Sequence, residues 1–109
     1  MKDAIVYKVD KDGITGHIRM KALSYEERMT KYDEFNLISE DGEIKQGSMT
    51  GKKMIDAKKL VEERCIDVEV ISGDVKIDSI EDLGKYDVGI TFIGEAFGLL
   101  LGGQKLGKS

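Results

Sequence analysis

The chain has 109 residues, 40% of them hydrophobic and 35% charged, with a net charge of −4 and no proline. This composition predicts one globular domain and argues against both a disordered chain and a basic nucleic-acid-binding surface. The single cysteine, Cys65, excludes an internal disulfide. The sequence has no apolar run long enough to span a membrane and no signal-peptide core near its start, so we expect a cytoplasmic protein.

The N-terminal part has the pattern of a β-hairpin. Residues 4–9 and 14–23 alternate between apolar and polar side chains, and residues 10–13, which contain aspartate and glycine, are typical of a turn. Gly16 suggests a bulge or an edge position. The apolar faces of the two strands carry Ile5, Tyr7, Val9, Ile14, Ile18, Met20 and Ala22.

A helix over residues 25–36 is predicted next. Ser24 and Glu27 form a capping box, a combination that is typical of a helix start. An apolar stripe along this helix is expected to pack in the core and contains Tyr25, Met29, Tyr32 and Phe35. Residues 39–42 end the element, and we interpret residues 43–48 as a loop because they carry little pattern.

A second helix is predicted from about residue 50 or 52 to Arg64, with one apolar face and one charged face. The apolar face contains Met54, Ala57, Val61 and Cys65. Alternation over residues 66–70 predicts a third strand. A turn at residues 72–74 would allow the short run 75–77 to pair back on that strand.

The C-terminal part is predicted to be helical. Asp78 or Ser79 caps a brief helix over residues 80–83, and a final helix over residues 88–101 follows. The apolar side chains of the final helix span roughly 220° of the helical wheel at 100° per residue. This arc is about twice as wide as the stripe of a surface helix, so we expect contacts on more than one side.

The remaining arc of the final helix carries glycine on every fourth residue, at Gly94, Gly98 and Gly102. Such a ridge lets another backbone approach closely. Because each interior glycine costs about 1 kcal/mol relative to alanine, the helix needs packing contacts, either as a core helix or as a surface completed by another chain. The candidate protein-binding residues are Phe92, Gly94, Glu95, Phe97, Gly98, Leu100 and Leu101.

These elements predict an α+β fold, with a small antiparallel β-sheet, formed by the N-terminal hairpin plus a third strand, packed against three to four helices. We interpret residues 1–109 as a single domain. Its parts are the hairpin, two helices, a strand region, the C-terminal helices and a tail, at residues 1–23, 24–66, 66–78, 79–103 and 104–109.

The sequence carries no catalytic signature, and we expect no catalytic residue, cofactor or metal site. One histidine and one cysteine cannot build a catalytic triad or a zinc site within one chain, and His17 is expected to face solvent. Residues 102–109 match the phosphate-binding pattern G-x-x-x-x-G-K-[ST], which requires a preceding strand and a following helix. A helix is predicted before this loop instead, so an enzyme or nucleotide-binding protein that uses this loop is the least favoured function.

Several segments together suggest a family. A β-rich start is followed by SYEERM at residues 24–29, IDSIEDL at residues 77–83, a tyrosine, a hydrophobic last helix and QKLGK at residues 104–108. This layout resembles the small tail assembly chaperones of long-tailed bacteriophages. The resemblance implies a non-enzymatic protein of the host cytoplasm that coats the tape-measure protein, keeps its long helices soluble and recruits tail-tube subunits.

We therefore expect a protein partner, further copies of the chain in a homo-oligomer, or both, and neither nucleic acid nor membrane. The partner would be the tape-measure protein or a tail-tube subunit. The alternative is a structural virion subunit of the tail or connector that self-assembles through the sheet edge or the hairpin.

Overall fold

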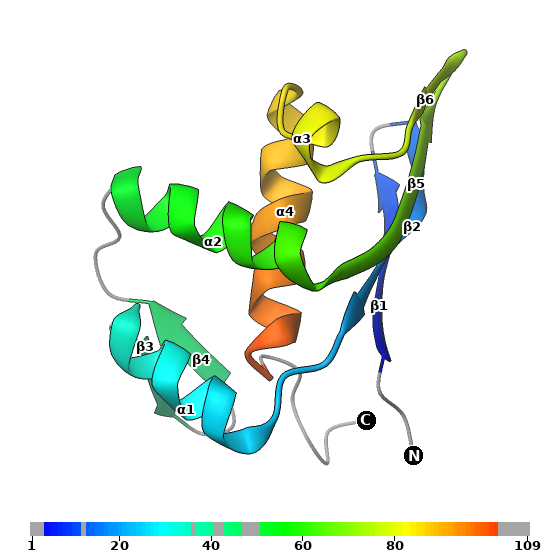
Figure 1. The fold of residues 1–109 in the computed structure, drawn as a ribbon. Helices are drawn as coiled ribbons and strands as arrows, with labels where there is room; N and C mark the ends of the chain where they lie inside the picture. Colours follow the sequence, from blue (N-terminus) through cyan, green and yellow to red (C-terminus); the bar gives the residue numbers. More distant parts are fainter. Residues whose placement is uncertain (1–3, 12, 36, 41–42, 47–50, 103–109) are drawn as a thin grey trace.

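The computed structural model describes residues 4–11, 13–35, 37–40, 43–46 and 51–102 (Figure 1). The elements in chain order are β1 (Ala4–Lys11), β2 (Ile14–Lys21), α1 (Tyr25–Glu34), β3 (Leu37–Glu40), β4 (Glu43–Gln46), α2 (Gly51–Arg64), β5 (Cys65–Ser72), β6 (Val75–Ile77), α3 (Ile80–Leu83) and α4 (Asp87–Leu100). They form an α+β fold with a four-stranded antiparallel sheet, so the predicted fold class is confirmed. Within the described residues, no helix is both long and apolar enough to cross a membrane.

The main sheet has the strand order β1-β2-β5-β6, and α2, α3 and α4 lie on one side of it (Figure 1). The predicted hairpin is confirmed, because β1 and β2 pair along their whole length from Ala4 opposite Lys21 to Lys11 opposite Ile14. The alternation explains the burial: one face of the sheet packs on the helices and the other face stays open. The fully or nearly buried side chains of the inner face are Val9, Ile18, Met20, Val68, Val70 and Ile77.

Gly16 lies in the interior of β2, which has a paired strand on both sides. Its φ is +153°, and a Cβ atom there would overlap the carbonyl oxygen of Glu69 on β5. Glycine is therefore required by the close approach of the β5 backbone, and the prediction of a bulge or edge at Gly16 is wrong. The register shift lies between Arg19 and Met20, where Ile66 has no partner and is 49% exposed.

Helix α1 begins at the predicted capping box. The Glu27 N–H donates to the Ser24 hydroxyl at 3.1 Å, and the Ser24 N–H donates to the Glu27 carboxylate at 2.8 Å. This backbone hydrogen bond is the main reason that the pKa of Glu27 is lowered. Arg64, at the end of α2, donates to the carbonyls of Lys21 and Ala22 and ties the segment before α1 to α2.

The apolar stripe of α1 packs in the core only at its C-terminal end, so the prediction of a core face is wrong for Tyr25 and Met29. Tyr25 is 68% exposed and Met29 is 39% exposed, and no residue of the helix is fully buried. Helix α1 lies at the periphery, away from the sheet (Figure 1). Only the C-terminal end of the stripe reaches the core, where Tyr32 is partly buried and Phe35 is 4% exposed.

The segment after α1 forms a small separate hairpin, in which β3 and β4 pair from Leu37 opposite Gln46 to Glu40 opposite Glu43. The interpretation of residues 43–48 as a loop is therefore wrong for residues 43–46. The sequence did carry a signal, because the Asp-Gly pair at residues 41–42 is a frequent hairpin turn. Two strands of four residues were too short for their alternation to show.

Helix α4 is the centre of the hydrophobic core and lies between the sheet and α2 (Figure 1). The Tyr32 hydroxyl donates to the Leu101 carbonyl at 3.0 Å and satisfies one acceptor at the end of α4. At the other end, Ser79 caps α3, and the buried Gly89 lies directly against the Leu83 backbone. Both C-terminal helices and the pairing of β6 with β5 thus agree with the predictions.

Candidate functional site

Four of the seven predicted protein-binding residues lie in the core of the chain itself. Phe92, Phe97, Leu100 and Leu101 are 0%, 2%, 1% and 0% exposed. The Phe97 ring lies 4.9 Å from the Phe35 ring, measured between centroids. This part of the apolar arc of α4 is therefore covered by the chain's own sheet and helices. In this fold the four side chains do not form the exposed partner surface that was predicted, although Phe97 lines the groove described below.

The other three predicted residues lie on the opposite side of α4. Glu95 accepts a hydrogen bond from the Tyr7 hydroxyl and so fastens α4 to β1. Burial, followed by the hydrogen bond and charge of Glu95, raises the pKa of Tyr7. A Cβ atom at Gly94 or Gly98 would meet no other atom within 4 Å, so no described element packs on this part of the glycine ridge.

The phosphate-binding pattern falls outside the described residues except for Gly102, which has a φ of +79° just after α4. The segment before the pattern is a helix. A phosphate-binding loop follows a strand, so the geometry before the loop does not fit that motif.

An apolar groove with a volume of about 390 Å³ lies between α2 and α4. Its floor is made by Ala57 of α2 and by Ile93 and Phe97 of α4, which are all nearly buried. Gly84 and Lys58 also line it, and a Cβ atom added at Gly84 would lie 3.1 Å from the Cε atom of Lys58. The lining of the groove is apolar apart from Lys58, its one charged residue among the described residues.

Three side chains on the rim of this groove keep about half of their surface exposed. Met54 is 52%, Ile55 is 57% and Ile90 is 52% exposed. Complete burial of one such side chain stabilises a complex or a fold by about 1.5–3 kcal/mol, so covering the exposed half of all three would contribute appreciably to binding. Gly94 also lines the groove, and its missing side chain would allow a partner to approach the α4 backbone.

Only two residues of this groove, Gly94 and Phe97, were predicted from the sequence to bind protein. Met54 was predicted on the apolar face of the second helix, but it is 52% exposed, and Ile55 had no predicted role. The exposure of Ile55 could have been expected, because it is an isoleucine outside the main apolar stripe of α2. The exposure of Ile90 could have been expected as well, because Ile90 lies at the margin of an apolar arc that is too wide for one neighbour to cover.

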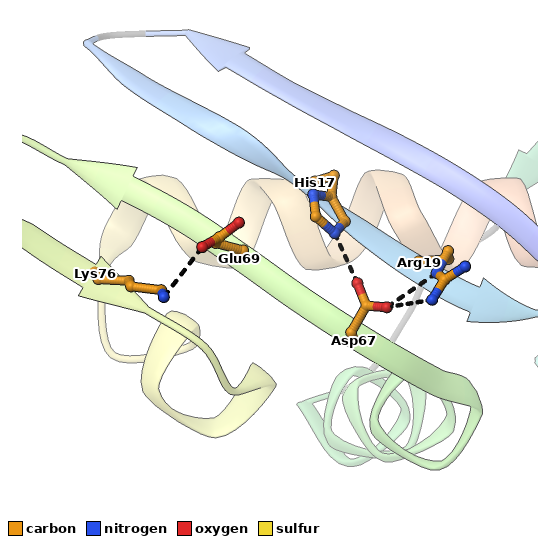
Figure 2. Close-up of polar contacts among 5 residues, drawn as sticks. All are labelled: His17, Arg19, Asp67, Glu69 and Lys76. Carbon is orange, nitrogen blue, oxygen red and sulfur yellow. Dashed lines mark hydrogen bonds and ion pairs between the residues drawn. The ribbon is translucent and has the colours of Figure 1, made fainter.

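The outer face of the sheet carries a ladder of opposite charges (Figure 2). Asp67 accepts from Arg19 at 2.6 and 2.9 Å and lies 2.6 Å from the Nε2 atom of the partly exposed His17. Lys76 and Glu69 form a second ion pair at 3.1 Å. These side chains satisfy one another across neighbouring strands, so the cluster stabilises the open face of the sheet.

The hydrogen bonds from His17 and Arg19 lower the pKa of Asp67 below its ordinary value. A carboxyl group whose pKa is lower in the folded chain than in the unfolded chain stabilises the fold at pH values above its ordinary pKa. This stabilisation is lost as the pH falls through the lowered pKa. We expect the free energy of unfolding to fall as the pH drops below about 4, and we expect a shallower fall in Asp67→Asn. Urea denaturation at a series of pH values tests this. The prediction is contradicted if the free energy of unfolding falls equally steeply with pH in Asp67→Asn and in the wild type. Asp33→Asn on α1 is the control and should keep the slope of the wild type.

Cys65 is partly buried and packs against the hydrophobic core at the start of β5. Burial, with the charges of Asp67 and Glu62 as smaller causes, raises the pKa of its thiol. A raised pKa disfavours the reactive thiolate. Cys65 was predicted on the apolar face of the second helix; it is instead the first residue of β5, where it still packs against the core.

The comparisons with known proteins found no relative. No protein-family model matches the chain, and no curated protein or solved structure shows significant similarity to it.

Proposed function

We propose that this protein is a non-enzymatic binding protein whose α2–α4 groove receives an apolar helix of a protein partner. The observation that supports this proposal is the half exposure of Met54, Ile55 and Ile90 around a floor of buried apolar side chains. A groove between two helices is suited to the apolar face of an amphipathic helix, whose side chains at helical spacing fill the depression. The open backbone at Gly94 gives such a helix room to lie close.

The resemblance to tail assembly chaperones gives this partner a candidate identity. A chaperone of that kind must cover the apolar surface of long tape-measure helices in the host cytoplasm before the tail tube assembles around them. The groove would hold one face of such a helix, and the charged outer surface would keep the complex soluble. Recruitment of tail-tube subunits belongs to the same proposal.

Co-expression with the tape-measure protein from the same genome tests the proposed function. We expect the wild-type chain to keep the tape-measure protein soluble and to co-purify with it. Ile55→Asp and Ile90→Asp each place a charge in the groove, and desolvating that charge is costly, so we expect at least a tenfold loss of binding, equivalent to about 1.4 kcal/mol.

Ile71→Asp is the matched control, because Ile71 is 44% exposed and lies on β5 in the open sheet face. The variants must keep the circular dichroism spectrum of the wild type. If Ile55→Asp and Ile90→Asp bind as tightly as Ile71→Asp, the groove is not the binding site. If the wild type also fails to bind the tape-measure protein, the chaperone identity is wrong.

A further inference from the structure

Strand β1 is an open edge of the main sheet. It is eight residues long, and among the described residues only β2 pairs with it. At the opposite end of the sheet, β6 has only three residues. A long edge strand rich in β-branched and aromatic residues is a template for pairing with another strand, unless its charges prevent it.

The charges of β1 select one way of pairing with a second copy. Lys8 and Asp10 are exposed and lie on the outer face, while Tyr7 and Val9 lie on the inner face. An added strand must keep inner-face residues opposite inner-face residues. Within β1, antiparallel registers of this kind place Lys8 opposite Lys8, opposite the apolar Ala4 or Val6, or opposite Asp10. Only the last register, with Val9 opposite Val9 at the two-fold axis, puts opposite charges directly together.

We propose that two copies of this chain pair antiparallel through β1, with Lys8 of each copy opposite Asp10 of the other. The pairing joins two four-stranded sheets into one continuous sheet and repeats the Lys8–Asp10 contact twice by symmetry. The same charges favour this register over the one that places Lys8 opposite Lys8. The contact uses the sheet edge and is independent of the α2–α4 groove.

Charge reversal tests this register. Lys8→Glu and Asp10→Lys each turn both symmetric contacts into like-charge repulsions, so each variant alone is expected to dimerise at least about tenfold more weakly than the wild type. A mixture of the two variants restores opposite charges at both contacts, and the double variant carrying both substitutions does the same. Sedimentation equilibrium on the full chain up to submillimolar concentration measures these affinities.

The expected result is a concentration-dependent dimer for the wild type, a loss in each single variant, and recovery in the mixture and the double variant. Lys52→Glu, an exposed reversal on α2, is the control and leaves dimerisation unchanged. A wild type that stays monomeric throughout overturns the proposal. So does a dimer that both single reversals leave intact, because that dimer uses another surface. If each single variant dimerises more weakly and the mixture of the two does not recover, the proposed register is wrong.

Discussion

Phe97→Ala is expected to lower the free energy of unfolding by about 3–5 kcal/mol, the usual cost of removing a large buried aromatic side chain. Phe97 is 2% exposed and stacks at a tilt against Phe35 while also forming part of the groove floor. Its removal leaves a cavity where α4 meets α2 and the end of α1. Urea denaturation followed by circular dichroism measures the change.

Ile90→Ala is the matched control on the same helix. Ile90 is 52% exposed, so its truncation removes less buried surface and is expected to cost about 1 kcal/mol. The difference between the two variants reports whether the inner side of α4 is a core face. If both cost about 1 kcal/mol or less, α4 is not held in the core as described here.

Gly89→Ala is expected to destabilise the chain by about 3 kcal/mol, near the upper end of ordinary overpacking. The added methyl group would overlap the carbonyl oxygen of Leu83, which belongs to the backbone and cannot rotate away. Either α3 or the first turn of α4 has to move. Thermal and urea unfolding compared with the wild type measure the loss.

Gly94→Ala makes the same chemical change five residues further along α4 and is expected to have the opposite sign. A methyl group there meets no atom within 4 Å, so the gain in helix propensity raises stability by up to about 1 kcal/mol. It also fills part of the groove, so partner binding is expected to weaken while stability rises. Destabilisation of similar size at both positions would show that the helix–helix packing differs from this structure.

The sequence predicted most elements of the fold because their signals are local. The alternation of residues 4–9, the capping box at Ser24 and the long apolar pattern before Gly102 each depend on near neighbours in the chain, and the structure confirms all three. The hairpin formed by β3 and β4 was missed because its strands are only four residues long. Their alternation is too short to distinguish from a loop.

The candidate site was harder to predict, because exposure depends on where elements pack. Met54 and Phe97 both belong to apolar helix faces, and the sequence cannot show that the first stays half exposed while the second is buried. The requirement for glycine at position 16 could not be predicted for the same reason. Only the pairing of β2 with β5 shows that the carbonyl oxygen of Glu69 leaves no room for a side chain there. A periodic pattern identifies an apolar face and leaves its partner undetermined.

In this structure α4 is an internal core helix, and we propose that a partner meets only its exposed margin. Amide hydrogen exchange of the isolated chain, read at each residue by NMR, tests this most directly. We predict that the α4 amides from Phe92 to Ala96 exchange as slowly as those of Ile18 and Val70 in the central strands, because all of them open only in global unfolding. Fast exchange of α4 while the sheet stays protected would instead show a helix that another chain must complete.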